Sequence, residues 1–365
     1  MLTSARQTIP TNAGVQENLL PRMLERPKPV IWVLQGPRAG DNAQAHALAS
    51  MLDAQVVCKH LTFNNLCVLP SLMLGASIAS VETESRKSLA PPWPKLVIAI
   101  GRRSAPVARW IKRQSREQTK AVHLGRPRTS LSAFDLVITT PQYGLPPAAN
   151  VMEIPLPFVA SRAVDALELA TWRDEWAGLR RPLIGVAIGN AKFPLKLGRR
   201  EARLLGQRLN SLADQMNGTL LLIPSPRSVP DVIARIEADL SAPHLAYRTF
   251  DPQRNPYPAA LMECDHFVAT SDSISMISEL ISTGKPVDVF ELPDRILKLK
   301  WRASSGVRAW LSRSGILQPP RDVSGMVRAL IRNGYVNDLG EQRMRIPFER
   351  SHTATLERLC QLLAT

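Results

Sequence analysis

The sequence predicts an α/β protein built from two Rossmann-like domains that face a cleft. Its 365 residues are long for one compact core, so two domains are expected. Short apolar runs that stop at glycine or polar loops alternate with helical stretches, which is typical of a parallel sheet covered by helices on both faces. The alternation lapses at residues 161–181 and then restarts, so we expect two similar halves in tandem.

The first half begins with the apolar run at residues 30–34, which stops at Gly36-Pro37 in the manner of a buried strand. The same pattern returns twice, and helical stretches lie between the runs. We therefore expect strands at 30–34, 95–100 and 134–140 and helices at 43–52 and 105–113.

The second half repeats this order. It begins with the apolar run at 182–188, and a long amphipathic helix follows at 199–216. The further expected elements are strands at 219–223, 266–269 and 286–290 and helices at 229–240, 258–264 and 273–282.

The expected domain boundaries follow from where the pattern starts, lapses and ends. A polar helix with tryptophans at 167–179 occupies the lapse, and a last helix at 353–363 is expected to pack back across the first domain. The expected parts are a flexible tail at 1–28, a first Rossmann-like domain at 29–160, a linker at 161–181, a second Rossmann-like domain at 182–340 and a C-terminal helical segment at 341–365.

The net charge of +15 predicts a partner of opposite sign, such as nucleic acid, an anionic membrane surface or a phosphorylated substrate. Only 5% of the residues are aromatic, and the chain carries no nucleic-acid recognition motif, so we expect no nucleic-acid partner. The composition does not indicate an oligomeric state.

The four cysteines are far apart and form no CxxC pair, so we expect buried thiols in a reducing compartment without a disulfide framework or a metal site. No long apolar run follows the basic residues at the N-terminus, which predicts a cytoplasmic protein. The alternative is that the Arg-bearing, hydroxylated first stretch is a transit segment, against which Glu17 and Glu25 argue weakly. The uncharged run at residues 64–80 is too short and too polar to span a bilayer. It is either a buried helix or a surface that lies on the inner face of a membrane.

The segment that follows the predicted strand at 266–269 carries the clearest site signal. Thr270 opens a run of small hydroxylated residues, and a helix begins at about residue 273. The free backbone N–H groups and the dipole of such a helix make its first turn a natural phosphate site. Ser273 and Ser275 are expected to add hydroxyl donors, and Glu279, on the face of Ser275, to accept hydrogen bonds from ribose hydroxyls.

An ordinary capped helix is the alternative for this segment. In that case Asp272 or Ser273 is the N-cap and Gly284 closes the C-terminus. We favour the binding site, because capping alone does not require so many hydroxyls beside an inward carboxylate.

Two loops of the second half add candidate residues for a nucleobase and a phosphate. Asn255, Pro256 and Tyr257 precede the helix at 258–264, where backbone groups and a ring would hold a nucleobase; a proline-rich turn explains them equally well. Ser225 and Arg227 follow the strand at 219–223, and Arg227 is either a bidentate contact to a diphosphate or a solvated arginine.

The remaining candidate loops join a predicted strand to the next helix. Gly189 and Asn190 form a flexible loop that is able to approach a ligand. In the first half, the loop 36–44 lacks the GxGxxG spacing, and its Asp41 is either a helix N-cap or a general base that faces the cleft. The acceptor or phosphate contacts expected in the first half are Gly36, Arg38, Asn42, Arg102 and Arg126, and His123 is a second candidate base.

The stretch NPYPAALMECDHFVATSDSISMISELISTGKPVDVFEL resembles the signature of the mitochondrial-fission family named for elongated mitochondria in plants, which includes bacterial members. GDNAQ, AIGRRSAPVARWIK and HLGRPRTSLSAFDLVITTPQYGLP extend the resemblance over most of residues 30–320. The second half of this family is similar to glycosyltransferase-B enzymes that use nucleotide-diphosphate sugars. The resemblance implies that Ser273, Ser275 and Met276 line the diphosphate turn, that Glu279 binds ribose and that Asn255-Pro256-Tyr257 lie by the base.

The resemblance implies a first, acceptor domain and a second, nucleotide-sugar-binding domain. The expected function is a glycosyltransferase that moves a hexosyl-type group from a nucleotide-diphosphate sugar, as donor substrate and without a required cofactor, to a lipid-linked or other membrane-associated acceptor. The first turn of the helix near Ser273 would stabilise the leaving diphosphate, and Asp41 or His123 would deprotonate the acceptor. The alternative is a non-catalytic adaptor that recruits partners to an anionic membrane surface.

Overall fold

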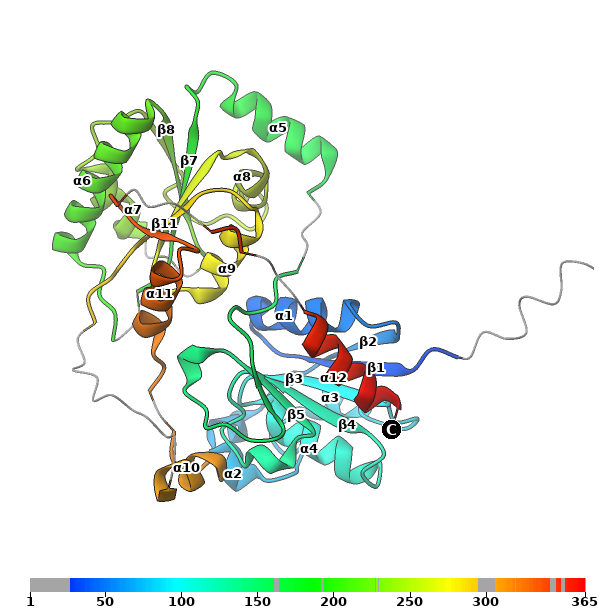
Figure 1. The fold of residues 1–365 in the computed structure, drawn as a ribbon. Helices are drawn as coiled ribbons and strands as arrows, with labels where there is room; N and C mark the ends of the chain where they lie inside the picture. Colours follow the sequence, from blue (N-terminus) through cyan, green and yellow to red (C-terminus); the bar gives the residue numbers. More distant parts are fainter. Residues whose placement is uncertain are drawn as a thin grey trace, which may run out of the picture.

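The computed structural model shows two parallel sheets with helices on both faces (Figure 1). Each sheet has six strands, and every pairing within them is parallel. The predicted fold class is therefore confirmed. The structure describes residues 27–160, 164–191, 194–226, 228, 230–294, 306–318, 320–341, 346–348 and 352–364.

The first sheet is covered on opposite faces because its strands alternate their side chains. Ile31 and Val33 of the first strand enter one core cluster, and Trp32 and Leu34 enter the other. Helix α1 (Ala39–Ser50) packs on the first face and α4 (Ser104–Gln114) on the second. The strand order is β2 (Gln55–His60), β1 (Val30–Gln35), β3 (Leu96–Ile100), β4 (Lys120–Leu124), β5 (Leu136–Thr139) and β6 (Val151–Glu153).

The second sheet has the strand order of a Rossmann domain. Numbered from its own first strand, the sheet reads 3-2-1-4-5-6 from one edge to the other. The order from that edge is β9 (His244–Ala246), β8 (Thr219–Pro224), β7 (Leu183–Ile188), β10 (His266–Thr270), β11 (Val287–Phe290) and β12 (Asn337–Asp338).

Two groups of helices cover the second sheet, and each shares a core cluster with one of its faces. The first group holds α5 (Ala166–Trp176), α8 (Tyr257–Glu263), α9 (Ile274–Ser282) and α11 (Val323–Arg332). The second group holds α6 (Arg199–Met216) and α7 (Pro230–Glu237).

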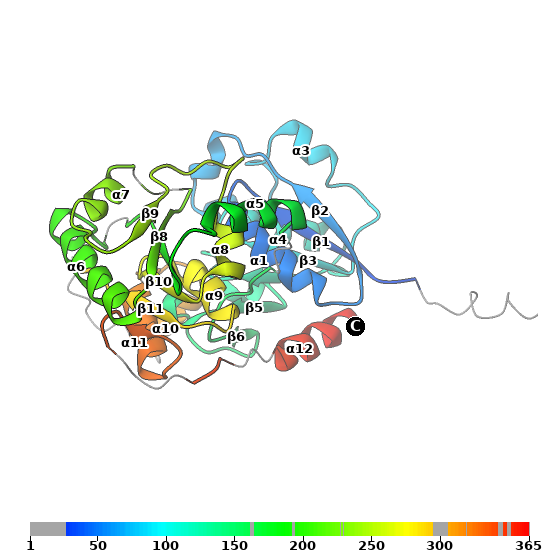
Figure 2. The ribbon, with the colours of Figure 1, turned by 90° about the horizontal axis from the view of Figure 1, so that it is seen from above.

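The last helix of the chain, α12 (Thr353–Ala364), lies beside the first sheet (Figures 1 and 2). Its Leu359 has no exposed surface and belongs to the same core cluster as Ile31 and Leu48. Thr355 donates a hydrogen bond to the sulfur of Met152 in β6. The chain thus returns to the first sheet after completing the second.

The uncharged run at 64–80 forms short turns, not one buried helix. Its helical parts are a 3₁₀ turn at Asn65–Val68 and the four-residue α2 (Ser71–Leu74). Two further short helices are α3 (Thr83–Lys87), which follows this run, and α10 (Gly306–Arg313), which lies in the second half of the chain. Among the helices described, none is both long and apolar enough to cross a membrane.

Candidate functional site

Each sheet has one point where neighbouring strands send their helices to opposite faces. In the second sheet β7 leads to α6 on one face and β10 leads to α9 on the other. In the first sheet β1 leads to α1 and the adjacent β3 leads to α4. Open parallel sheets bind ligands outside the carboxyl ends of the strands at such switch points. Both sheets therefore offer a candidate site at these strand ends.

The two switch points face each other across the gap between the sheets. Gln44 of α1 donates a hydrogen bond from Nε2 to Oγ of Ser275 in α9, at 3.1 Å. Deeper in α9, the buried Ser278 donates to the carbonyl oxygen of Pro157, at 3.0 Å. Figure 1 shows α9 directly against α1. Sequence reasoning had not assigned Gln44 a role, although it lies in the GDNAQ segment.

The ends of β7 and β10 are joined by a short hydrogen-bond chain. The backbone N–H of Gly189 donates to Oγ1 of Thr270 at 2.8 Å, and this hydroxyl donates to Oδ1 of Asp272 at 2.7 Å. A Cβ atom on Gly189 would lie 2.2 Å from Oδ2 of Asp272. A side chain at residue 189 would displace the Asp272 carboxylate from its hydrogen bond with Thr270.

Helix α9 begins without a side-chain cap. Its N-cap is Ser273, one of the two residues that the capped-helix alternative named, in an extended conformation and without a capping hydrogen bond from its side chain; Asp272 is not the N-cap. Gly284, with φ +72°, follows the C-cap Thr283, as that alternative also expected. The backbone N–H groups of the first turn and the positive end of the dipole face the gap near Ser275. Met276 packs its side chain into the core, so that only its backbone is left for a ligand. Glu279 is half-buried one turn further on.

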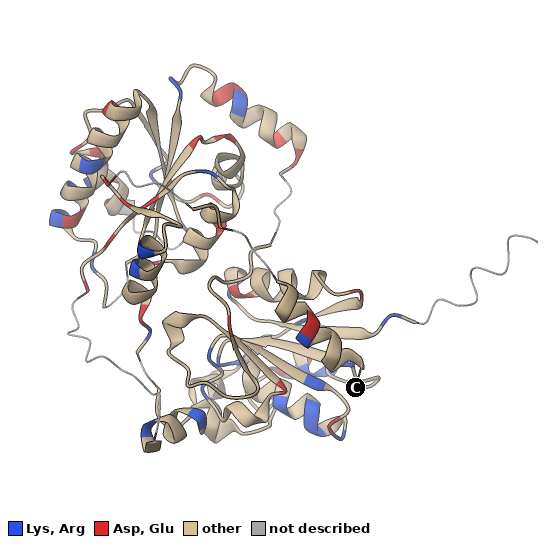
Figure 3. Cartoon of the chain, in the orientation of Figure 1, with Lys and Arg blue, Asp and Glu red and all other residues tan. Residues whose placement is uncertain are grey.

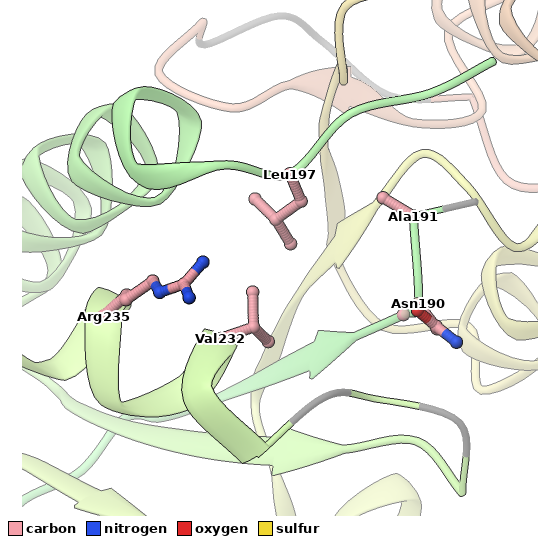
Figure 4. Close-up of a pocket in the computed structure, with 6 residues that line it drawn as sticks. Asn190, Ala191, Leu197, Val232 and Arg235 are labelled. Carbon is pink, nitrogen blue, oxygen red and sulfur yellow. The ribbon is translucent and has the colours of Figure 1, made fainter. Parts of the chain in front are cut away.

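A cavity of about 100 Å³ lies beside the β7 end. Figure 4 shows Arg235 of α7 reaching toward Leu197 and Val232, while the amide of Asn190 points away from the arginine. Arg235 also forms an ion pair with Asp231 at 3.2 Å. The cavity is well below the roughly 300 Å³ of an ordinary small-molecule site, so it accommodates only part of a nucleotide.

Sequence reasoning missed Arg235, because a basic residue on an amphipathic helix is ordinarily a solvated one. Arg227, the arginine that the sequence analysis proposed as a contact to a diphosphate, lies outside the described residues. Ser225 is held by the loop itself: its N–H donates to Oγ of Ser228, and that hydroxyl donates to the Ile188 carbonyl oxygen at 2.7 Å.

The loop expected by the nucleobase fits the proline-turn interpretation better. Oδ1 of Asn255 accepts from the backbone N–H of Tyr257 at 3.1 Å, and Pro256 is the N-cap of α8. The Tyr257 ring packs against the core of the second sheet and its hydroxyl oxygen is buried. Neither side chain is presented as an exposed platform for a base.

In the first sheet, two hydrogen bonds of the Asn42 side chain hold the loop that follows β1. Its side-chain amide donates to the Gly36 carbonyl oxygen at 2.8 Å and its Oδ1 accepts from the Gly36 N–H at 2.9 Å. One N–H and the Oδ1 of the Asn42 amide thus hold the loop, and the expected contact of Asn42 to an acceptor stays a prediction.

Asp41 lies at the switch point of the first sheet. The N-cap of α1 is Arg38, so the alternative in which Asp41 caps this helix is wrong. Oδ2 of Asp41 lies 3.6 Å from the position of a Cβ on Gly101, at the end of β3, and 3.9 Å from the Arg38 guanidinium. The Asp41 side chain is 33% exposed, so it is accessible as a general base.

The structure corrects the interpretation of His123. The side chain has no exposed surface, and its Nε2 lies 3.1 Å from the Gly101 carbonyl oxygen, to which it donates. Burial lowers the pKa of the imidazole to about 4, against the opposing effect of the backbone at Gly101 and Gly125. A base must reach its substrate, so the role of His123 as a base facing the cleft is wrong.

Arg102 is also placed by the fold rather than by a ligand. Its guanidinium donates to the carbonyl oxygens of Cys67 and Val68, at 3.1 and 3.2 Å, and so anchors the uncharged run. The expected contact of Arg102 to an acceptor stays a prediction. Arg126, in contrast, lies at the end of β4 on the same sheet edge as Asp41 and is only 9% exposed.

Two Rossmann-like domains whose switch points face each other, with a last helix that returns to the first domain, define a protein of the glycosyltransferase-B fold. The chain belongs to the family described as Mitochondrial fission ELM1, whose model matches residues 39–327. The resemblance seen in the sequence is thus confirmed.

Two related proteins and several solved structures are similar to the chain. Mitochondrial fission protein ELM1 of Arabidopsis thaliana is 30% identical over 241 residues, which are 60% of this chain and 56% of that protein, so the match spans about half of its length. An uncharacterized protein of Rickettsia prowazekii (strain Madrid E) is 24% identical over 304 residues, which are 72% of this chain and 84% of that protein.

Among solved structures, UDP-GlcNAc 2-epimerase of Methanocaldococcus jannaschii is 10% identical with a TM-score of 0.46, and the match covers 92% of this chain and 99% of that one. ADP-heptose lps heptosyltransferase II of E. coli is 14% identical with a TM-score of 0.43, covering 83% of this chain and 98% of that one. These low scores carry no argument about what this chain binds.

Proposed function

We propose that this protein binds a nucleotide-diphosphate sugar between its two sheets and transfers the sugar to a membrane-associated or cell-envelope acceptor. One observation carries the proposal: the start of α9, which has no side-chain cap, lies at the switch point of the second sheet and contacts α1 of the first through Gln44 and Ser275. A donor at one switch point would then meet an acceptor at the other.

The proposed roles follow from the chemistry of each group. The backbone N–H groups and hydroxyls near Ser273 and Ser275 bind the diphosphate and stabilise the charge that develops on it as the sugar leaves. Arg235 adds a cation beside this loop. Glu279 accepts hydrogen bonds from the ribose, and Asp41 removes the proton of the acceptor hydroxyl.

An exposed apolar surface supports a membrane-associated acceptor. The side chains of the run at 64–80 that point outward are large and uncharged, and the chain as a whole carries a charge of +15. Figure 3 shows Lys and Arg on the neighbouring α4 of the same domain. Apolar insertion and attraction to anionic lipids act together in peripheral binding. The exposed side chains are Leu66 (46%), Val68 (70%), Leu69 (39%), Leu72 (46%) and Met73 (72%).

A non-catalytic adaptor is the second candidate, and two observations favour it. The Asp272 carboxylate fills the strand-end space beside Gly189, and the adjoining cavity of about 100 Å³ is too small for a whole nucleotide. Membership of the Mitochondrial fission ELM1 family is equally compatible with a recruiting role. In that case the protein recruits partners to a membrane and turns over no sugar.

Nucleotide binding tests the proposal first. The full chain is titrated calorimetrically with UDP, GDP, ADP, CMP and their sugars, together with Glu279→Ala and the control Glu168→Ala, an exposed acidic residue on α5. We expect one nucleotide to bind, and Glu279→Ala to weaken it about tenfold or more through loss of a charged hydrogen bond. The control should bind as the wild type does.

Turnover then separates the enzyme from the adaptor. If a nucleotide sugar binds, its hydrolysis or transfer should be detectable, and Asp41→Asn should abolish it without changing nucleotide affinity. Binding without any turnover favours the adaptor. A folded protein that binds none of the nucleotides contradicts the donor site altogether.

A further inference from the structure

Arginines from both halves of the chain converge on one tyrosine between the sheets. Tyr143 lies in the turn after β5, Arg126 follows β4, and Arg321 precedes α11 of the second sheet. The guanidinium carbons of Arg126 and Arg321 lie 5.9 and 5.1 Å from the centre of the Tyr143 ring. Cation–π contacts of this kind hold both guanidinium groups beside the same ring.

Hydrogen bonds to Gln142 hold Arg321 in this arrangement beside Tyr143. Arg321 donates from Nε and Nη2 to Oε1 of Gln142, which is 3% exposed. The side-chain amide of Gln142 in turn donates to Oγ1 of Thr140 at 2.9 Å. The backbone carbonyl oxygen of Gln142 accepts from the N–H of Asp322 at 2.8 Å. Arg321 is thereby held against the edge of the first sheet, although it belongs to the second half of the chain.

The close approach of the tyrosine to β4 requires a glycine. Gly125 has φ +76°, and a Cβ there would lie 3.3 Å from three atoms of Tyr143, which is tighter than an ordinary contact. The ring therefore packs on the β4 end. A larger residue at 125 would separate the ring from Arg126.

Arg126 is the buried member of the cluster, and Arg321 is exposed. The pKa of the Arg126 guanidinium is lowered to about 10, chiefly by burial and also by the like charges of Arg128 and Arg321. An anion beside guanidinium groups that repel one another offsets this repulsion. A phosphoryl group suits the geometry, since planar guanidinium groups bind phosphate oxygens in pairs.

We propose that Arg126 and Arg321, beside Tyr143, bind a phosphoryl group carried by the acceptor substrate. The inference rests on the proposed function, and it names the chemical class of the acceptor: a phosphate ester, either a lipid headgroup or a soluble sugar phosphate. The cluster lies on the same sheet edge as Asp41, because β4 is the neighbour of β3 and adjacent strands are about 4.8 Å apart. An acceptor anchored here presents a hydroxyl toward Asp41.

Binding of simple phosphates tests the site. The full chain is titrated with inorganic phosphate and with short-chain, soluble phosphatidic acid, and so are Arg321→Ala, Arg126→Lys and the control Arg328→Ala, an exposed α11 arginine paired with Glu291. We expect Arg321→Ala to weaken binding about tenfold or more, because charged hydrogen bonds are lost, while Arg328→Ala changes it little. Arg126→Lys keeps the charge but loses the planar fork, and should weaken binding as well.

A second experiment distinguishes a phosphoryl group on a lipid acceptor from one on a soluble acceptor. Phosphatidylcholine vesicles with and without phosphatidic acid are compared in a sedimentation assay. A lipid acceptor predicts binding that requires phosphatidic acid and is lost in Arg321→Ala. A soluble acceptor predicts that sugar phosphates compete with inorganic phosphate while vesicle binding does not depend on Arg321.

Equal binding by Arg321→Ala and Arg328→Ala would overturn the inference, since the cluster would then act only through net charge. Displacement of phosphate by a bound nucleotide would overturn it too, because the anion would occupy the donor site. Should Arg126→Lys not fold, Arg321→Ala, which changes an exposed side chain, still decides. If the protein binds phosphate in a manner that depends on Arg321 but binds no nucleotide, the phosphate site is supported and the donor site is contradicted. If it binds a nucleotide but no phosphate, only the donor site is supported.

Discussion

The Asp272 carboxylate shows how one side chain sets the shape of the candidate donor site. It takes a hydrogen bond from Thr270 and fills the space above Gly189, so the ends of β7 and β10 are joined. A carboxylate in this place repels an approaching diphosphate unless the start of α9 and Arg235 outweigh it. The balance of these charges decides between a donor site and an adaptor surface.

The buried His123 is a second single residue with a testable effect, because its lowered pKa makes the free energy of unfolding depend on pH. Its folded-state pKa of about 4 lies below the ordinary 6.5 of histidine, because burial disfavours the charged form. The unfolded chain therefore binds a proton as the pH falls through 6.5, whereas the folded chain does not. The stability from a neutral His123 is present above pH 6.5 and is lost as the pH falls toward 4, by up to on the order of 3 kcal/mol.

We expect His123→Gln to flatten the pH dependence of unfolding in this window. Urea unfolding of wild type and variant is measured from neutral pH down toward pH 4, with the glutamine Nε2 retaining a donor for the Gly101 carbonyl oxygen. The control is His60→Gln, at the exposed end of β2. Parallel pH profiles for wild type and His123→Gln would contradict the assignment.

At the scale of elements, apolar periodicity predicted the long and buried parts well. The helix expected at 199–216 coincides with α6, and the strand at 182–188 begins one residue early. The strands β2, β4, β6, β9 and β12 were missed. The last three are two or three residues long, and polar residues interrupt the apolar runs of β2 and β4. Short edge strands form only through pairing with a neighbour, which a local pattern does not show.

The packing of α12 on the first sheet predicts a local loss of stability. Leu359 has no exposed surface there, so Leu359→Ala should leave a cavity and lower the free energy of unfolding by about 2–5 kcal/mol. Chemical unfolding followed by fluorescence measures the change. The neighbouring exposed Cys360 provides the control as Cys360→Ala.

This loss should appear in the transition that reports the first sheet, since Leu359 belongs to the core cluster of that sheet. An unchanged midpoint for Leu359→Ala, equal to that of Cys360→Ala, would show that α12 does not pack there in solution.

At the scale of the whole molecule, the charge of +15 and the apolar run at 64–80 predict a membrane-facing surface. We expect the protein to sediment with phosphatidylcholine vesicles that contain phosphatidylglycerol, and to be released by salt. Val68→Ser combined with Met73→Ser should weaken this binding about tenfold at constant salt, because two apolar side chains no longer insert.

Leu167→Ser is the matched control for the vesicle experiment. Leu167 is 77% exposed on α5 of the other half, so its loss removes a similar apolar area from a different face. If both variants bind vesicles as the wild type does, the run at 64–80 is not the docking surface. If Leu167→Ser weakens vesicle binding equally, exposed apolar side chains contribute to binding wherever they lie on the surface.

The sequence by itself determined the two-domain α/β class, most of the buried strands and long helices, and the family, because these depend on local periodicity and on short motifs. The tertiary structure alone decided which strand ends become switch points, since strand order is a property of non-local pairing. It also decided that Gln44 meets Ser275 and that Arg126 and Arg321 meet at Tyr143. The burial of His123 and the anchoring of Arg102 were decided in the same way, because side chains of one type become core, anchor or site according to what the distant chain places beside them.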